Sequence, residues 1–374
     1  MSPQQFDVII VGGGAIGAAT LHFLAKNGIT NTLLLEQRGR FARGATGAWG
    51  SLLRQFGALP FYNQLSPDAF HYYRHEFAED TGVSPGFLTT GCLYFVRPKE
   101  SPRFESRIAW LQRSTNCPIE ILDAARGRLQ FPEFQWFDDE VAVYEPLAGL
   151  ICPYVVTEAW LESAKRRGAR ALTDRRVVEI RISNGRVTGV RCEEGSTFYC
   201  KELVLAAGPW TRSLLDSLKI ETPLIVRPIQ VNRFEFQKSY SEQQLPFFLD
   251  ATEISFGRPM LDGSFLGGYM TDESVCTTGF RQPLSVRQAA EAKRKLAKRL
   301  KWLRTAALIG GVRALESYTP EEHPFLRYSE SHPNLLVAAG WCCTGFALAP
   351  VFAQRIASLV QSRRVEPWPQ TASL

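Results

Sequence analysis

The fold of this chain is decided by the stretch FDVIIVGGGAIG, residues 6–17. Residues 6–11 are a run of β-formers, and the glycine-rich turn after them opens a segment of small and apolar residues at 18–26. A second apolar run at 32–35 ends in Glu36. The order strand, glycine-rich turn, helix, strand and acid is typical of a dinucleotide-binding βαβ unit.

Each position of the turn has a mechanical role. Gly12 permits the tight turn, Gly14 lets a pyrophosphate approach the backbone, and Gly17 lets the helix pack closely on the strand. Ala15 and Ile16 follow at the start of the helix, where free N–H groups and the positive end of the helix dipole favour phosphate. We therefore predict that these five residues bind a cofactor.

FAD and NAD share this fingerprint, so the choice rests on the residues after Glu36. We predict that Glu36, followed by Gln37, accepts hydrogen bonds from the adenosine ribose hydroxyls. Residues 38–57, RGRFARGATGAWGSLLRQFG, are rich in Gly and Arg and contain no predicted strand, whereas a nicotinamide domain would continue with further βαβ units. This favours FAD. Small residues suited to close approach by its pyrophosphate or ribityl chain are Gly44, Ala45 and Thr46.

Later segments repeat the pattern of strands that end in small residues. We predict a helix at 157–167, a strand at 169–182 and a returning strand at 186–191 after the turn Asn184-Gly185. Buried strands follow at 203–210 and 335–340, and a helix runs from about 349 to 362. The N-terminus of that last helix could stabilise negative charge at the flavin N1/O2 edge. The cofactor-binding residues predicted here are Val178, Ala207, Gly208, Trp210, Gly340, Cys343, Thr344, Gly345 and Phe346.

The net charge of +6 is concentrated in one element. Residues 281–304 hold nine Lys or Arg against the single acid Glu291. A capping box at Ser285 and Gln288, and an apolar stripe at Leu296, Leu300 and Leu303, predict a basic helix over 285–304. A solvated face is the plain interpretation, and docking to an acidic electron acceptor or a lipid surface is the alternative. Nothing in the pattern favours nucleic acid.

The eight cysteines form no CxxC pair and have no histidine at zinc-ligand spacing, so we expect no metal site. Reduced thiols favour a cytoplasmic location. No stretch approaches the roughly 20 apolar residues of a membrane-spanning helix, and we expect no leader peptide.

The sequence resembles the D-amino-acid oxidase superfamily, in the branch of sarcosine oxidase, glycine oxidase and dimethylglycine dehydrogenase. The resemblance covers nearly the whole chain. It rests on VIIVGGGAIGAAT at 8–20 with Glu36, VLAAGPWT at 204–211, TPEEHP at 319–324 and LLVAAGWCCTGFALAP at 335–350.

The resemblance implies an α/β plus antiparallel β fold. A Rossmann-type FAD domain, residues 1–85, 145–215 and 310–374, would be interleaved with a substrate domain of mixed or antiparallel sheet and helices, residues 86–144 and 216–309. It further implies oxidation of a C–N bond of an amino acid or secondary amine, with hydride transfer to flavin N5 and hydrolysis of the resulting imine.

Several positions depart from the family pattern. Ala314 stands where sarcosine oxidases link their flavin to a cysteine, so we expect noncovalent FAD. Leu266 and Met270 stand where those enzymes have a lysine that activates oxygen and a histidine, which favours an acceptor other than oxygen. Arg54 matches the first of two basic groups that hold the substrate carboxylate, but the second falls on Ala347.

The catalytic candidates are therefore Arg54, as a carboxylate ligand, and Tyr269, as a hydroxyl in the substrate pocket. Trp49 and Phe56 either wall that pocket or pack in the core, and His323 is interpreted as structural. The expected partners are a small amine or amino acid and an acceptor that is oxygen, a protein or a quinone; a homo-oligomer stays open. The alternatives are a 2-hydroxy-acid dehydrogenase and a flavin-bearing assembly or electron-transfer subunit without turnover.

Overall fold

The first strand, β1 (Gln5–Val11), lies inside an eight-stranded sheet assembled from distant parts of the chain. The computed structural model describes residues 5–49, 52–97, 102–115, 117–236, 245–260, 262–275 and 283–362. β1 pairs in parallel with β2 (Thr32–Leu35) on one side and with β12 (Thr197–Leu205) on the other. The glycine-rich turn therefore leaves the carboxyl edge of parallel strands, where ligands bind in such sheets.

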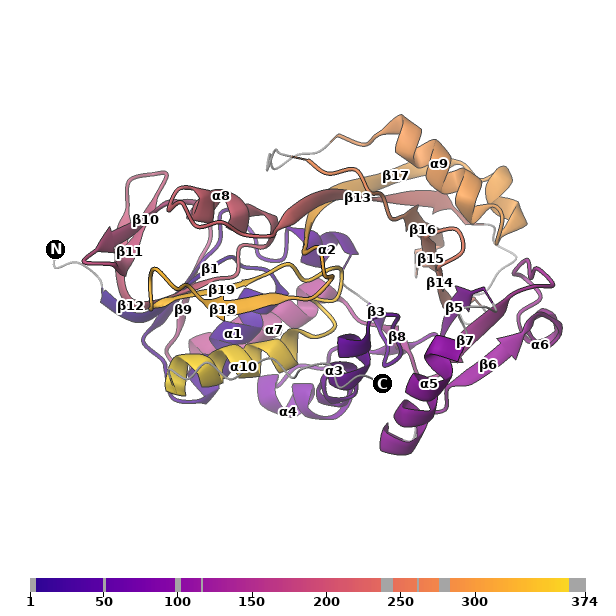
Figure 1. Ribbon diagram of the computed structural model, residues 1–374, viewed down its shortest axis with the longest axis horizontal. Coiled ribbons are helices and arrows are strands. Elements are labelled where there is room, and N and C mark those ends of the chain that lie inside the picture. The colour runs from indigo at the N-terminus through magenta and orange to yellow at the C-terminus, as the bar shows by residue number, and fades with distance from the viewer. Residues whose placement is uncertain are drawn as a thin grey trace.

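The other strands extend this first sheet at both ends (Figure 1). Beside β2 lies the parallel strand β9 (Arg170–Leu172). Beside β12 lie the hairpin β10 (Val177–Ser183) and β11 (Arg186–Cys192) and, at its carboxyl end, the parallel strand β19 (Leu335–Ala339) with β18 (Phe325–Tyr328) antiparallel to it.

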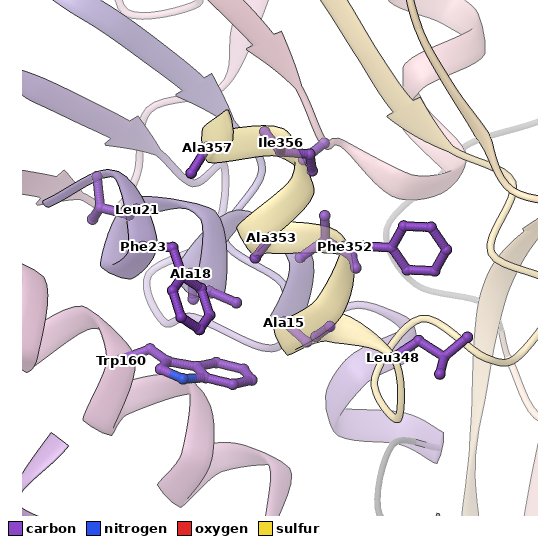
Figure 2. Packing of buried hydrophobic residues seen from close by; sticks show 14 of the residues in the cluster. Ala15, Ala18, Leu21, Phe23, Trp160, Leu348, Phe352, Ala353, Ile356 and Ala357 are labelled. Carbon is purple, nitrogen blue, oxygen red and sulfur yellow. The ribbon is translucent and has the colours of Figure 1, made fainter. Parts of the chain in front are cut away.

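Three helices cover one face of the first sheet: α1 (Ala15–Lys26), α7 (Pro153–Arg166) and α10 (Ala349–Ser362). Their buried side chains interdigitate in one cluster, in which Trp160 of α7 lies near Phe23 of α1, and Phe352 and Ala353 come from α10 (Figure 2). Trp160 is fully buried, and its indole N–H donates to Tyr72 Oη at 3.2 Å. The helices α3 (Pro60–His71) and α4 (Phe77–Thr81), joined by the π-helical turn Tyr72–Glu76, pack at the edge of this layer.

The second sheet also has eight strands, in the order β17-β13-β16-β15-β14-β5-β7-β6. All neighbours are antiparallel except β14 and β5. The strands are β5 (Cys92–Val96), β6 (Glu120–Asp123), β7 (Val141–Glu145), β13 (Ile225–Glu235), β14 (Phe247–Asp250), β15 (Ser255–Pro259), β16 (Ser264–Tyr269) and β17 (Leu308–Tyr318). Its helices and turns are α5 (Pro102–Thr115), α6 (Ala124–Gln130), α9 (Val286–Leu296) and the 3₁₀ turn η4 (Lys301–Arg304).

A small third sheet and three short turns complete the fold. The sheet has the order β3-β8-β4, from β3 (Leu52–Leu53), β8 (Gly149–Leu150) and β4 (Leu88–Thr89). These short helical turns are the α-helices α2 (Ala45–Trp49) and α8 (Thr211–Asp216) and the 3₁₀ turn η3 (Gly208–Trp210). The strand β3 corrects the expectation of no strand in 38–57, where its two residues pair with β8 and show too short a pattern to be recognised.

The expected strand at 169–182 is two strands. β9 and β10 lie at opposite ends of the strand order, and residues 173–176 between them carry Asp174 in a left-handed conformation with φ 53°. Here the Arg175 N–H donates to the Glu36 carbonyl at 2.9 Å, so the chain is bent past the end of β2. The helix expected at 157–167 begins earlier, at Pro153, because proline suits the first turn of a helix.

The division of the chain between two domains stays a proposal. The strands of the first sheet fall within the three segments expected for the FAD domain. The expected boundary at residue 310, however, falls inside β17, which pairs with β13 of the second sheet from Leu308 to Tyr318. We therefore place the start of the last segment after Tyr318.

The basic helix is shorter than expected. α9 ends at Leu296 instead of residue 304, and η4 follows after a turn. Ser285 caps it by accepting from the Gln288 N–H at 3.2 Å, but the Gln288 side chain donates to Glu273 rather than back to Ser285. Arg281 lies outside the described residues.

One cation of the basic run is part of the core. Arg299 is fully buried, and its Nε donates to Asp250 Oδ2 at 2.6 Å and its Nη1 to Glu140 Oε1 at 2.5 Å. The guanidinium also stacks on Phe95, with 4.1 Å between Cζ and the ring centroid. This buried ion-pair network ties the segment after α9 to β14 and to the residues before β7, so the solvated-face interpretation is wrong for Arg299.

We predict that Arg299→Met lowers the free energy of unfolding by about 3–5 kcal/mol, because it leaves two buried carboxylates without their cation. The control is Arg294→Met, since Arg294 is exposed on α9 and pairs only with Glu291 among the described residues. Thermal or urea unfolding of both variants measures the difference. Equal, small shifts for the two variants would contradict a structural role for the buried network.

Candidate cofactor and substrate site

A cavity runs from the end of β2 past the glycine-rich turn to the segment before α10. Its lining residues are Val11, Gly12, Gly13, Gly14, Ala15, Ile16, Leu35, Glu36, Gln37, Arg38, Gly44, Ala45, Thr46, Arg175, Arg176, Val177, Ala206, Ala207, Gly208, Pro209, Trp210, Ser213, Leu214, Glu316, Trp341, Cys343, Gly345 and Phe346. We call this the first cavity.

The turn at the start of α1 leaves room for a phosphate group. Gly12 has φ 114°, and a Cβ there would lie 2.4 Å from the Ala206 carbonyl oxygen. At Gly14, an added Cβ would come near only Thr46 Oγ1, at 3.2 Å, so the cavity side of this glycine is open. No side chain caps the helix at Gly14, and the first turn of α1 has no acidic residue. The Ala15 N–H donates to Thr46 Oγ1 at 3.1 Å, so the later N–H groups of the first turn and the helix dipole suit a pyrophosphate.

Glu36 closes the other end of this turn. Its Oε2 accepts from the Gly13 N–H at 2.7 Å and its Oε1 from the Arg38 N–H at 2.9 Å. Burial raises the pKa of Glu36, and the hydrogen bonds from Arg38 and Gly13 oppose that shift. Each carboxylate oxygen keeps a further lone pair for a ribose hydroxyl. The residues present thus suit the adenosine end of FAD.

Four predicted cofactor residues lie outside the first cavity. Gly17 packs the helix instead, because a Cβ there would lie 1.9 Å from the Gly12 carbonyl oxygen. Val178 does not line the cavity, whereas its neighbour Val177 does, because the side chains of successive residues lie on opposite faces of β10. Gly340 forms a turn with φ 71° at the end of β19. Thr344 lines the neighbouring cavity.

A second cavity adjoins the first, since Cys343 and Phe346 line both. Its lining residues are Leu52, Arg54, Gly57, Ala58, Leu59, Tyr62, Tyr94, Leu249, Asp250, Ala251, Ile254, Ser255, Phe256, Met270, Glu322, Cys342, Cys343, Thr344, Phe346 and Ala347. Strands β14 and β15 of the second sheet supply one wall, and the loop after β3 supplies another.

Arg54 contributes the cation of the second cavity. Its Nη1 contacts the Phe56 carbonyl, and its Cζ lies 4.7 Å from the Tyr62 ring centroid. Tyr62 Oη donates to the Arg54 carbonyl at 2.9 Å, which fixes the loop. No carboxylate among the described residues lies within ion-pair distance of Arg54. The nearby Glu145 is buried, and it accepts instead from the Gln55 and Phe56 N–H groups; burial raises its pKa to about 7.

The expectation that Tyr269 supplies a hydroxyl to the substrate pocket is corrected. Tyr269 does not line the second cavity, and Lys295 of α9 lies over its ring at 5.7 Å. Side chains alternate along a strand, so Tyr269 and its neighbour Met270 point to opposite faces of the sheet. Met270 lines the cavity, and Tyr269 faces α9.

The other aromatic and histidine candidates are structural where they can be placed. Phe56 is buried in a cluster with Phe104 and does not line the second cavity. His323 packs against Phe61 with tilted rings, 5.0 Å between their centroids, and lines neither cavity. The side chain of Trp49 lies outside the described residues.

Sequence reasoning missed Glu316, a buried carboxyl that lines the first cavity. Burial raises its pKa to about 7, and the Ser317 N–H opposes the shift. The sequence feature that could have indicated Glu316 is that it is the single acid in the strand that leads to TPEEHP, two residues after Ala314.

The adjacent cysteines occupy the junction of the two cavities. Both have left-handed backbones, with φ 49° at Cys342 and 63° at Cys343. Cys343 Sγ lies 3.0 Å from Tyr318 Oη. Burial raises the pKa of Cys342 to about 11 and that of Cys343 well above its ordinary value, so both thiols are neutral at pH 7.

Comparison with known proteins agrees with this geometry. Residues 7–359 match the DAO family, described as FAD dependent oxidoreductase. The chain belongs to this family. It is therefore an FAD-dependent oxidoreductase with a Rossmann-type FAD domain and a substrate domain. Among the described residues, no helix has the length and apolar composition that crossing a membrane requires, and these residues contain no cluster of metal ligands.

Two proteins of similar sequence and one solved structure show how far this chain resembles known proteins. The monomeric sarcosine oxidase of Streptomyces avermitilis is 27% identical over 96% of this chain and 94% of its own length. The mitochondrial pyruvate dehydrogenase phosphatase regulatory subunit of Mus musculus is 24% identical over 92% of this chain, which spans only 40% of that protein. The crystal structure of L-proline dehydrogenase from P. horikoshii superposes with a TM-score of 0.84 at 20% identity, covering 97% of this chain and 95% of that one.

We predict that FAD is bound without a covalent link. Ala314 provides no nucleophile, and the neutral thiols of Cys342 and Cys343 are poor ones because the thiolate is the reactive form. Acid precipitation of the yellow protein should release all the flavin into the supernatant. Flavin fluorescence that stays on the denatured protein band would contradict this and would point to one of the two cysteines.

We further predict that Glu36→Gln weakens FAD binding about tenfold or more. The amide keeps one acceptor oxygen and turns an NH₂ group toward a backbone N–H, and hydrogen bonds to charged groups contribute about 1.5–3 kcal/mol each. Dilution followed by ultrafiltration measures FAD retention, with Glu330→Gln outside both cavities as the control. An unchanged dissociation constant would show that Glu36 is not a ribose ligand.

Proposed function

We propose that this flavoenzyme oxidises the C–N bond of an amino acid or secondary amine to an imine, which then hydrolyses in water. The observation that carries the proposal is Arg54, a guanidinium that lines the second cavity and has no ion-pair partner among the described residues. A carboxylate next to the reacting carbon would supply that partner through a bidentate pair.

When FAD is bound in the first cavity, it supplies the acceptor for a hydride. The chain's own residues position the substrate and exclude water. Arg54 holds the carboxylate at one wall, and the apolar side chains of Leu249, Phe256 and Met270 contribute to the lining elsewhere. Orientation of this kind contributes a large part of the rate enhancement in reactions of bound substrates.

The two carboxylates among the described lining residues of the second cavity, Asp250 and Glu322, are not needed as a catalytic base. Both oxygens of Asp250 are already engaged, Oδ2 by Arg299 and Oδ1 by the Thr252 N–H and hydroxyl. Glu322 is exposed. An amine substrate that enters in its neutral form needs no base to release a hydride, which agrees with this arrangement.

The comparisons support the same substrate class. Sarcosine and L-proline, which appear in the names of two relatives, are both amino acids with a secondary amine. A regulatory subunit among the relatives supports the alternative of a flavin-bearing subunit without turnover. The two candidates differ in whether any small molecule reduces the flavin.

Anaerobic mixing with a panel of amines, N-methyl amino acids, imino acids and hydroxy acids distinguishes them by flavin bleaching. We expect bleaching by an N-alkyl or imino acid. Bleaching by hydroxy acids alone would favour a 2-hydroxy-acid dehydrogenase. A flavin that no compound bleaches would favour the non-catalytic subunit and contradict the proposal.

We predict that Arg54→Lys raises the apparent dissociation constant of a carboxylate substrate about tenfold, because the lysine keeps the charge but loses the planar fork. FAD content should not change. Arg74→Lys is the matched control, since Arg74 also stacks on an aromatic ring, Phe87 at 4.5 Å, but lies outside both cavities. Equal losses toward amines without a carboxylate would place Arg54 beside the flavin instead.

A further inference from the structure

The two faces of the second sheet can be told apart at β15 and β16. A Cβ at Gly267 would lie 2.6 Å from Leu296 of α9, and one at Gly257 would lie 2.4 Å from Phe265, so odd-numbered positions face the helix. Phe256 and Met270, at even positions, line the second cavity. Even-numbered residues of these two strands therefore share a face with the lining residue Phe256, although the odd-numbered Ser255 at the start of β15 also lines the cavity.

Arg258 lies on that face. It follows Phe256 by two residues on β15, and its register partner on β16 is Leu266, which packs against the same apolar cluster as Met270 and Cys343. The sequence alone did not indicate Arg258 as a site residue, because Leu266, the residue beside it in the sheet, belongs to another strand.

The guanidinium of Arg258 has neither an ion pair nor a hydrogen bond with any described residue. The residue is half-buried, and desolvation lowers its pKa to about 10, which the nearby Cys152 partly opposes. At pH 7 the guanidinium is still charged. A desolvated cation without a partner is unfavourable, so an anion that binds to it would lower the free energy of the site.

A second positive feature lies beside it. Cys152, which lies close enough to Arg258 to influence its pKa, is the N-terminal cap residue of α7, a helix of 14 residues. The cap makes no side-chain hydrogen bond, and the first turn of α7 contains no acid. The positive end of this helix dipole is thus not neutralised by an acidic side chain in that turn.

This place adjoins the second cavity. Leu150, two residues before Cys152, is the register partner of Leu52, and Leu52 lines the cavity. Arg54 enters the same cavity from the loop that follows Leu52. Arg54 lines the cavity from the loop after β3, and Arg258, which is not itself a lining residue, follows the lining residue Phe256 by two positions on β15.

We propose that Arg258, together with the N-terminus of α7, binds a second carboxylate of the substrate, so that the preferred substrates are amino acids carrying two carboxylates. This rests on the proposed function, in which Arg54 binds the first carboxylate. Arg258 acts here as a specificity-determining residue, and its effect is confined to substrates that reach it with a second anion.

Arg233 provides a matched control on the same face. It is the register partner of Leu266 from the β13 side, but it pairs with Asp262 and its Nε donates to Ser264 Oγ at 2.9 Å. Its charge is therefore already balanced. Arg233→Gln therefore removes a paired cation from this face of the sheet, whereas Arg258→Gln removes an unpaired one.

The test titrates the FAD-loaded protein with glutarate, a dicarboxylate, and with valerate, a monocarboxylate of equal carbon count, and follows the flavin absorbance. We expect glutarate to bind more tightly than valerate. Arg258→Gln should weaken glutarate about tenfold or more, the effect of losing one charge-assisted pair, and leave valerate unchanged. Arg258→Lys should weaken glutarate less, and Arg233→Gln should change neither ligand. Thermal midpoints confirm that each variant is folded.

Three results would overturn the proposal. They are an equal affinity of the parent protein for glutarate and valerate, an equal loss of both ligands in Arg258→Gln, and competition by inorganic phosphate as strong as that by glutarate. The outcome is separable from the proposed function. If no amine bleaches the flavin while glutarate binding still depends on Arg258, the function fails and the anion site stands.

Discussion

The close approach of α1 to β1 is the constraint on which the rest of the structure depends. A side chain at Gly17 would collide with the Gly12 carbonyl, and one at Gly12 with the Ala206 carbonyl at the end of β12. Only glycine at both positions lets the helix start directly above the carboxyl edge of the parallel strands. The cavity for the adenosine and phosphate groups follows, because Glu36 at the end of β2 and the small residues after β12 meet at the same edge.

This constraint is local in sequence, which is why the sequence predicted the first cavity well and the second cavity less well. Gly12, Gly14 and Glu36 lie within 25 residues and carry a fingerprint with a fixed meaning. The assignment of Tyr269 failed although a signal was present, since Met270 and Tyr269 must point to opposite faces of a strand. Arg299 could not be predicted, because its partners Asp250 and Glu140 are 49 and 159 residues away in sequence.

The buried and half-buried arginines differ in whether a described carboxylate pairs with them. Arg299 is surrounded by acceptors and holds the segment after α9, β14 and the residues before β7 in one arrangement, so its role is structural. Arg54 and Arg258 have no carboxylate within ion-pair distance among the described residues; Arg54 lines the second cavity, and Arg258 lies on β15 two residues after the lining residue Phe256. In the proposed function both cations are paired by carboxylates of the ligand, which offsets the cost of leaving them partly desolvated.

At the junction between the two cavities, a strained stretch of backbone is held in place by its contacts. Two successive residues other than glycine, Cys342 and Cys343, adopt a left-handed conformation that costs of order 1–2 kcal/mol for each. Their surroundings hold it: the Cys342 N–H donates to the Ser317 carbonyl, and Cys343 Sγ contacts Tyr318 Oη. Both contacts come from the end of β17, the strand that also places Glu316 in the first cavity. One strand of the second sheet therefore shapes the wall shared by both cavities, so any shift between the sheets would alter cofactor and substrate sites together.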